Sequence, residues 1–141
     1  MSTLAAQKAT TQAVLDAYNA WDLDAILAFR APDCQQQVLP ASMGRPSMSN
    51  SEYRERLKIL LPWFRKFTVT VHTTVHDAEQ HTCMMHATST AETDIGPYAN
   101  EYALVLHFTE DGKKVVRFLE YVDSKYSSEF FAKLAEKGFG K

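Results

Sequence analysis

The chain has 141 residues, of which 45% are hydrophobic, and its 15 basic and 17 acidic side chains give a formal net charge of -2. A chain of this length and composition forms one globular domain and buries a core without disulfides or structural metal. No block of Lys or Arg supplies the attraction for phosphate on which nucleic-acid binders depend, and no apolar run reaches the roughly 20 residues that span a bilayer. We therefore expect neither nucleic acid nor a membrane as a partner.

The N-terminal segment and the cysteines bear on the cellular compartment. Residues 1–8 show no basic stretch followed by an apolar one, so we predict no signal peptide. Cys34 and Cys83 lie far apart without Cys-x-x-Cys spacing, which favours two buried, reduced thiols over a metal or redox site. These features predict a cytoplasmic protein. Since no repeat or linker interrupts the sequence, we expect a single domain over residues 1–141.

Two helices are predicted at the start of the chain. Apolar residues at helical spacing predict the first over about residues 4–19. Asp22 is placed to cap a second, shorter helix, which Pro32 ends. Arg30 continues the apolar spacing of that helix, so we expect its side chain on the buried face.

A short strand over residues 35–39 and a third helix follow. Ser49, with Glu52 three residues later, forms a capping box that opens the helix. Pro62 suits the first turn of a new helical segment or a kink, so we expect the helix to break there.

The period of the sequence changes from helical to two at about residue 67. Val69, Val71 and Val75 alternate with polar residues, which predicts a half-buried strand. His72 and His76 fall on the opposite face, where we expect solvent or an interface. About 13 Å separates these two positions at roughly 3.3 Å per residue, so no metal site is predicted there.

Three more strands are predicted over about residues 82–93, 100–109 and 114–124, with Asp111-Gly112 as a two-residue hairpin turn between the last two. A final helix is expected after Ser128. The order predicts an α+β fold, in which a strongly bent antiparallel sheet wraps around the N-terminal helices as a cone. The mouth of such a cone is a place for a ligand.

Three segments carry a family resemblance: Ala17–Ala25, Gly96–Tyr102, and the hairpin from Asp111 to Ser124. Together they resemble the SnoaL-like branch of the nuclear transport factor 2-like superfamily, most of all small fungal proteins of meroterpenoid and polyketide biosynthesis. The resemblance implies the cone fold, a sizeable hydrophobic substrate, a homodimer and no cofactor. The superfamily contains isomerases, cyclases, dehydratases and non-enzymatic domains, so the fold does not decide the reaction.

The chain departs from the acidic residues of its relatives at two of three positions. The third-strand Asp of ketosteroid isomerases and SnoaL-type cyclases aligns with Leu104, so that acid is missing. The tyrosine-aspartate pair of scytalone dehydratases aligns with Tyr18-Asn19, where an amide that does not titrate replaces the acid. The last-strand Asp of limonene epoxide hydrolases falls in a string that resembles residues 119–123, and here a carboxylate survives as Glu120.

Glu120 is the first candidate for a catalytic group. It lies between apolar residues of the last strand, and apolar surroundings raise the pKa of a carboxyl group toward the range of a general acid or base. A two-residue hairpin would instead turn Arg117, Tyr121 and Asp123 toward the same side as Tyr102. The alternative for Glu120 is therefore a structural glutamate that meets a cation at an edge or interface.

His86 and Glu92 are the other catalytic candidates. They share one face of the second long strand with Met84 and Thr90, and relatives have a histidine near the position of Glu92, so we expect that face to be a cavity wall. The unperturbed pKa of histidine suits a proton carrier. The alternative is a hydrogen-bonded structural histidine in the sheet.

Arg30 is the most informative charge in the N-terminal half. A buried arginine needs a carboxylate, a carbonyl or an anionic substrate, so it either contacts substrate or forms a bridge with Asp33, Asp123 or Glu92. Aromatic side chains with polar tips suit a pocket for a polycyclic substrate, although most belong to cores. The other residues expected to contact substrate are Tyr18, Asn19, Tyr53, Trp63 and Tyr102.

No phosphate-binding loop, nucleophile elbow or dinucleotide fingerprint occurs, which leaves acid-base chemistry. We therefore expect a cofactor-independent isomerase, cyclase or dehydratase acting on a hydrophobic natural-product intermediate. The alternative is a non-catalytic domain that binds a hydrophobic ligand or only dimerises. Two converging carboxylate or imidazole groups in an enclosed cavity would favour the enzyme, and a cavity filled by Leu, Phe and Met would favour the alternative.

Overall fold

The computed structural model describes residues 3–141, in which a five-stranded sheet is combined with four α-helices. The elements are α1 (Thr3–Ala20), α2 (Leu23–Ala28), β1 (Arg30–Leu39), a short 3-10 helix (Ala41–Met43), α3 (Asn50–Trp63), β2 (Arg65–Asp77), β3 (Thr82–Thr93), β4 (Gly96–Phe108), β5 (Val115–Val122) and α4 (Ser124–Glu136). In this part of the chain, no helix is long and apolar enough to cross a membrane.

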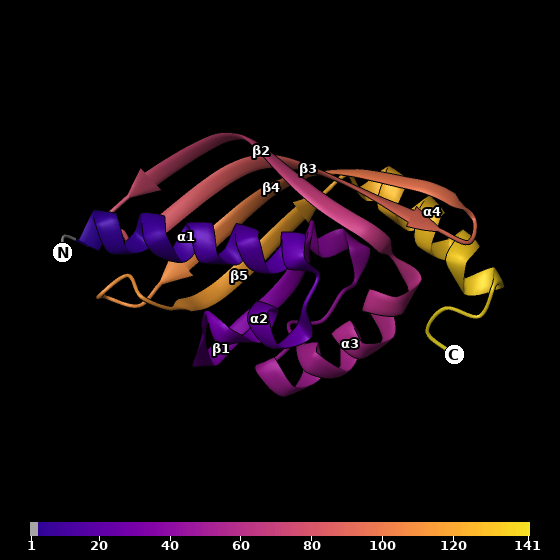
Figure 1. Ribbon diagram of the computed structural model, residues 1–141, viewed down its shortest axis with the longest axis horizontal. Helices are drawn as coiled ribbons and strands as arrows, with labels where there is room; N and C mark the ends of the chain where they lie inside the picture. The colour runs from indigo at the N-terminus through magenta and orange to yellow at the C-terminus, as the bar shows by residue number, and fades with distance from the viewer. Residues whose placement is uncertain (1–2) are drawn as a thin grey trace.

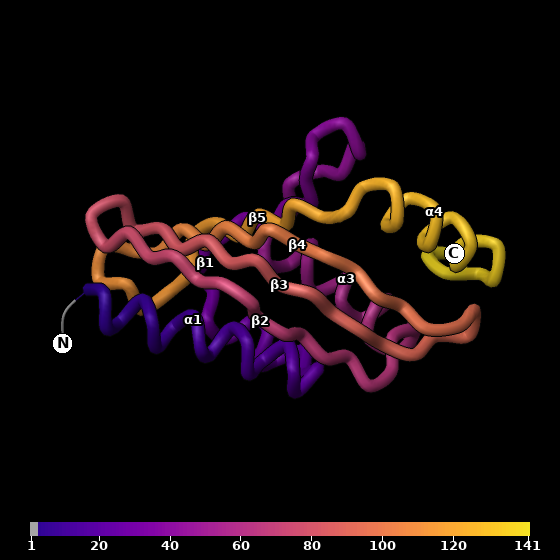
Figure 2. Tube along the Cα trace, turned by 90° about the horizontal axis from the view of Figure 1, so that it is seen from above, coloured from indigo at the N-terminus to yellow at the C-terminus, as the bar shows by residue number. Residues whose placement is uncertain are grey.

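The strands lie in the order β1-β5-β4-β3-β2. The meander from β2 to β5 is antiparallel, whereas β1 pairs with β5 in parallel, so the sheet is mixed. Figure 1 shows the long strands arched over α1, with α3 below the sheet and α4 at one end. The view from above places α1 beside β2 and the segment after β1 on the opposite side (Figure 2). The α+β cone predicted from the sequence is confirmed, but the sheet is not wholly antiparallel, because the strand predicted at residues 35–39 is part of β1, which joins the meander in parallel.

Local signals place the ends of the helices. The Asp22 carboxylate accepts a hydrogen bond from the Ala25 amide at 2.9 Å and so caps α2. Ser49 and Glu52 form the predicted capping box at the start of α3. That helix ends at Trp63, one residue after Pro62, and strand β2 begins at Arg65.

Two predicted boundaries are wrong. Arg30 does not belong to a helix: α2 ends at Ala28, and Arg30 is the first residue of β1. The last helix begins at Ser124, four residues before Ser128, because the Asp123 side chain accepts a hydrogen bond from the Tyr126 amide and caps it there.

The β4–β5 hairpin is longer than predicted, with a loop over residues 109–114 in place of a two-residue turn. Gly112 adopts a φ of 75° in this loop, and its carbonyl accepts a hydrogen bond from Thr10 Oγ1 at 2.7 Å. A Cβ atom at Gly112 would lie 3.0 Å from the Thr3 carbonyl oxygen and 3.1 Å from Ala6 Cβ. Glycine is therefore required where the loop meets the first turns of α1.

A bulge in β2 changes which side chains face the core. The register with β3 shifts between Val71 and Thr73, so the parity of the strand is reversed after that point. Val75 consequently lies on the outer face, 62% exposed, while His76 turns inward beside Gln7. The prediction that His76 lies opposite Val75 on the outer side is wrong for this reason.

The core forms in two parts. The larger part joins α1, α2 and α3 to the inner face of the sheet, and Cys34 and Cys83 lie there, buried and unpaired as expected. The smaller part gathers aromatic residues around α4 at the end of the sheet. Side chains of both parts line the cavity described next.

Candidate active site

A cavity of about 320 Å³ lies on the inner side of the sheet, between α3, α4 and the segment after β1. A smaller hollow of about 60 Å³ shares Tyr18, Phe67, Tyr102 and Glu120 with it. Most of the lining is aromatic or aliphatic. The polar and charged groups among the lining residues are Tyr18, Gln36, Arg45, Tyr53, Arg56, Tyr98, Asn100, Tyr102, Glu120 and Ser127.

Glu120 is the carboxyl group of this cavity. It stands directly opposite Leu104 in the β4–β5 register, so it faces inward together with Tyr102 and Val122. Burial raises the pKa of Glu120 to about 7, against the opposing effects of a hydrogen bond from Gln36 and the charge of Arg30. The carboxyl group therefore exchanges its proton near neutral pH.

A chain of hydrogen bonds connects Glu120 to a buried arginine. Arg30 Nη1 donates to Gln36 Oε1 at 2.8 Å, and Gln36 Nε2 donates to Glu120 Oε1. Because the amide oxygen of Gln36 accepts from the guanidinium, its NH₂ group must point at the carboxyl group. Gln36 is fully buried, so the Glu120 side chain is held in one orientation.

Arg30 itself lies behind the cavity wall. Its Nε donates to Asn50 Oδ1 at 2.8 Å, and its guanidinium stacks on the Tyr53 ring at 4.7 Å. None of the carboxylates described in residues 3–141 forms a salt bridge with it, so the alternative of a bridge to Asp33, Asp123 or Glu92 is wrong. Arg30 is thus a positioning residue for Gln36 and Glu120 rather than part of the cavity surface.

Two phenol groups meet at the cavity from α1 and α3. The hydroxyls of Tyr18 and Tyr53 are 2.7 Å apart, and burial raises the pKa of both, with Glu120 adding to the effect. Both phenols therefore stay neutral. Their mutual hydrogen bond uses one of two O–H groups, which leaves the other to donate to a ligand.

A second hydroxyl network covers the β4 side of the cavity. Tyr102 OH lies 2.6 Å from Ser89 Oγ and 3.2 Å from Tyr98 OH. Asn100 Nδ2 donates to Tyr98 OH and to Ser127 Oγ, both at 2.8 Å. This network holds Tyr102 on the wall between Glu120 and the aromatic end of the cavity.

Comparison with known proteins gives the family. A model of the SnoaL-like domain matches residues 11–118. The chain belongs to the SnoaL-like domain family. It is 34% identical over 128 residues to monooxygenase nsrQ of Aspergillus novofumigatus, covering 91% of this chain and 85% of the relative. It is 35% identical over 130 residues to monooxygenase AgnL5 of Paecilomyces divaricatus, covering 92% and 81%.

The fold of this SnoaL-like protein has a solved counterpart. The crystal structure of BvnE pinacolase from Penicillium brevicompactum aligns with a TM-score of 0.92 at 26% identity, over 96% of this chain and 99% of that one. The resemblance stated from sequence segments is confirmed. Leu104, the position expected from the sequence to align with the relatives' third-strand acid, pairs with Glu120 of β5, so the carboxyl group lies beside that position.

His86 and Glu92 do not line the cavity. The alternation of β3 buries Cys83, Met85 and Ala87, and it turns the other set of side chains outward, so the prediction that this outer set forms a cavity wall is wrong. His86 lies half-exposed with Nε2 2.6 Å from a carboxylate oxygen of Glu101.

The ion pair of Glu92 also lies at the surface. Its carboxylate meets Lys66 Nζ at 3.3 Å, and both side chains are more than half exposed.

The predicted substrate-binding residues divide into two groups. Tyr18, Tyr53 and Tyr102 line the cavity, whereas Asn19 and Trp63 do not. Asn19 is exposed, and its Oδ1 accepts a hydrogen bond from the Val69 amide at 2.8 Å, which ties α1 to the edge strand. The Trp63 ring packs edge-on against Phe139.

Several lining residues were not predicted from the sequence. Trp21, Gln36, Arg45, Arg56 and Asn100 all contribute to the cavity. Asn100 and its neighbours form a segment that the resemblance had marked, so that signal could have identified it. Gln36 lies in a run of three glutamines whose inward member no sequence pattern distinguishes.

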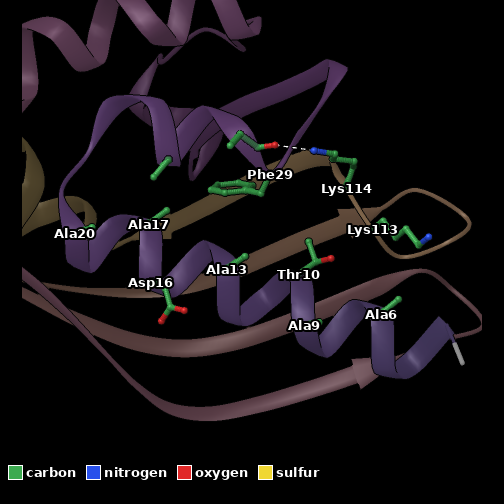
Figure 3. Close-up of a pocket in the computed structure, with 12 residues that line it drawn as sticks. Ala6, Ala9, Thr10, Ala13, Asp16, Ala17, Ala20, Phe29, Lys113 and Lys114 are labelled. Atoms are coloured by element: carbon green, nitrogen blue, oxygen red, sulfur yellow. Dashed lines mark hydrogen bonds between the residues drawn. The ribbon is translucent and has the colours of Figure 1, made fainter. Parts of the chain in front are cut away.

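A larger hollow of about 690 Å³ lies along α1 and carries no comparable chemistry. Its floor is a row of alanines that includes Ala6, Ala9 and Ala13, and Lys113 and Lys114 stand at one end (Figure 3). The Lys114 ammonium donates to the Ala28 carbonyl at 2.7 Å. We therefore place the candidate active site at Glu120.

Proposed function

We propose that this SnoaL-like protein is a cofactor-independent acid-base enzyme that isomerises, cyclises or dehydrates a hydrophobic polycyclic secondary-metabolite intermediate. The observation that carries the proposal is Glu120, a buried carboxyl group with a pKa of about 7 in a largely apolar cavity. Acid-base groups act best when the pKa lies near the working pH. A volume of about 320 Å³ is in the range of small-molecule sites.

The proposed step begins with the ionised Glu120. Its carboxylate removes a proton from a carbon next to a substrate carbonyl, and the electron pair moves to the carbonyl oxygen. The free O–H of the Tyr18–Tyr53 pair donates a hydrogen bond to that oxygen. The proton then returns from Glu120 to another carbon, which isomerises the substrate, or to a hydroxyl group that leaves as water.

The test is an assay on the compound that accumulates when the gene is deleted from its source organism. Wild-type protein in D₂O should convert it to an isomer that carries deuterium from solvent at carbon, or to a product lighter by one water. The rate should rise with an apparent pKa of about 7 as Glu120 ionises. Glu120→Gln should lower the rate by about 10²- to 10⁴-fold. Glu129→Gln, which changes an exposed carboxylate of α4, is the matched control.

The names of the relatives supply a second candidate, since nsrQ and AgnL5 are called monooxygenases. Oxygen insertion into a carbanion would also begin with proton removal by Glu120. The same assay separates the two reactions: consumption of O₂ and a product that has gained one oxygen atom and lost two hydrogens, with the second oxygen released as water, would contradict our proposal. Isotope-labelled O₂ identifies the source of that atom.

The non-catalytic alternative has its own outcome in this assay. The described lining contains one carboxyl group and no imidazole, so two such groups do not converge there. Phenols and guanidinium groups accompany Glu120 instead. If the accumulated compound binds stoichiometrically and is recovered unchanged, with no deuterium, the protein is a binding domain and the acid-base proposal fails.

We also propose that the protein forms a homodimer through the outer face of the sheet. Val75, Met84 and Tyr121 lie on that face with 62%, 51% and 45% of their surface exposed, although each is a large hydrophobic residue. Such residues gather at interfaces. Light scattering at micromolar concentration should give the dimer mass, and Met84→Glu should give the monomer. A monomeric wild type would overturn the proposal.

A further inference from the structure

The cavity lining includes two arginines that the acid-base proposal does not use. Arg45 lies in the segment between the 3-10 helix and α3, and Arg56 lies on the second turn of α3. Both line the cavity. Both are partly buried, so neither is an ordinary surface charge surrounded by water.

Each guanidinium group lies over an aromatic ring. The Arg45 Cζ atom is 5.7 Å from the centre of the Phe131 ring, and Arg56 Cζ is 5.0 Å from that of Phe139. Such a cation–π contact uses the positive charge of the guanidinium and none of its N–H hydrogen-bond donors. The aromatic contacts therefore hold both guanidinium groups and leave their N–H groups for another partner.

Carboxylates of the described chain do not supply that partner. The five salt bridges found within residues 3–141 involve neither arginine. The nearest acidic residues along α3 are engaged elsewhere: Glu52 accepts from the Ser49 amide at 2.9 Å, and Glu55 meets Lys58 at 2.9 Å.

The two cations also act on each other. Burial lowers the pKa of Arg56, and the positive charge of Arg45 lowers it further, so the groups are close enough to repel. Two like charges in the lining of an apolar cavity are unfavourable unless an anion joins them. Glu120 does not serve, because its hydrogen-bond partner is Gln36.

From this arrangement we infer that Arg45 and Arg56 form a carboxylate-binding subsite, and that the substrate is a polycyclic carboxylic acid. Its ring system lies in the cavity and its carboxylate lies between the two guanidinium groups. This rests on the proposed function and deepens it, because the subsite sets which end of the substrate reaches Glu120. Planar N–H pairs of arginine match the two oxygens of a carboxylate.

The experiment compares two probes of the same shape, 2-naphthoate and its neutral amide, 2-naphthamide. Titration calorimetry at pH 6 keeps the naphthoate ionised, since a carboxylic acid has a pKa of about 4. We expect wild type to bind naphthoate about tenfold or more tightly than naphthamide, because hydrogen bonds between charged groups are the strong ones. The naphthoate affinity should fall as KCl is raised, and the naphthamide affinity should not.

Variants assign the preference to the two arginines. In the Arg45→Gln/Arg56→Gln double variant, naphthoate should bind no more tightly than naphthamide, with naphthamide affinity unchanged. Arg54→Gln, on the exposed side of the same helix where Arg54 pairs with Asp24, should keep the preference. Circular dichroism melting checks that each variant is folded.

Three results would overturn the inference: equal affinity of wild type for both probes, a preference that survives in the double variant, or no binding of either probe. The first two leave the acid-base proposal standing, because naphthamide binding alone still reports an apolar cavity. Loss of turnover in Glu120→Gln tests that proposal separately.

Discussion

Replacing Glu120 by Gln should stabilise the protein at neutral pH while it removes the proposed catalytic group. Glutamine has the shape of a protonated glutamate, and its amide oxygen is able to accept the hydrogen bond that Gln36 donates. The variant therefore keeps the buried contact and removes the ionisation that burial disfavours. Stability and activity should change in opposite directions.

The magnitude follows from the two pKa values of Glu120. In the folded protein the value is about 7, and in an unfolded chain a glutamate has a pKa of about 4.3. Between these values the folded state holds one proton more than the unfolded state, so the free energy of unfolding of wild type falls as the pH rises and levels off above about 7. At about 1.4 kcal/mol per pKa unit, the full loss is about 4 kcal/mol, of which about 3 kcal/mol falls between pH 4.5 and pH 7.5.

Urea denaturation of both proteins from pH 4.5 to 8, followed by tryptophan fluorescence, measures this effect. The stabilities should be similar near pH 4.5, and Glu120→Gln should exceed wild type by about 3 kcal/mol at pH 7.5, or about 10 °C in Tm. The exposed Glu129→Gln should show no such trend. A constant difference at all pH values would refute the raised pKa, and a variant less stable than wild type at pH 7.5 would show that Arg30 stabilises the ionised form.

Three further predictions concern the groups around this carboxyl. Gln36→Leu removes the hydrogen bond that lowers the pKa of Glu120, so the apparent pKa of the pH-rate profile should rise by about one unit. An unchanged apparent pKa would show that Gln36 does not influence the proton affinity of Glu120. Tyr18→Phe should lower kcat about 10- to 100-fold with little change in Tm, whereas an unchanged kcat would exclude the hydroxyl pair from the reaction. Gly112→Ala should lower the free energy of unfolding by about 2 kcal/mol in urea titrations, since φ is 75° and the added Cβ meets α1; wild-type stability would refute that packing argument.

Much of the fold was predictable because its signals are local. Side chains that cap a helix act on amides three residues away, so Asp22 and the Ser49–Glu52 box marked the starts of α2 and α3 correctly. The two-residue alternation predicted β3 at the residues where it is observed, but the alternation alone did not show which of its two faces is buried. These features do not depend on distant parts of the chain.

The errors arose where distant contacts decide. The β2 bulge at residues 71–73 and the six-residue loop before β5 each shift a strand relative to its neighbour, and a shift of one residue reverses every side chain. No local sequence pattern predicts such a change of register. Arg30 was assigned to a helix because its spacing matched, yet the pairing of β1 with β5 makes it the first residue of a strand.

The candidate site shows the same division. Glu120 was identified because a carboxylate in an apolar strand is unusual and the resemblance marked its string. Its partner Gln36 is 84 positions away, and Arg45 lies in a segment without periodic pattern, so only the fold brings them together. His86 and Glu92 were chosen for their chemistry, and strand parity places them on the other face.

The indirect connection between Arg30 and Glu120 explains how a buried carboxyl group keeps a pKa near neutrality. Two unit charges 4 Å apart attract by about 4 kcal/mol at an effective dielectric constant of 20, which corresponds to about three pKa units. A direct ion pair would therefore cancel the effect of burial and hold the carboxylate ionised. With the neutral amide of Gln36 between them, the charge of Arg30 acts from farther away while the hydrogen bonds still fix the geometry. Gln36 thus orients the carboxyl group and lowers its pKa only in part, while burial keeps the pKa near the value that reversible proton transfer at neutral pH requires.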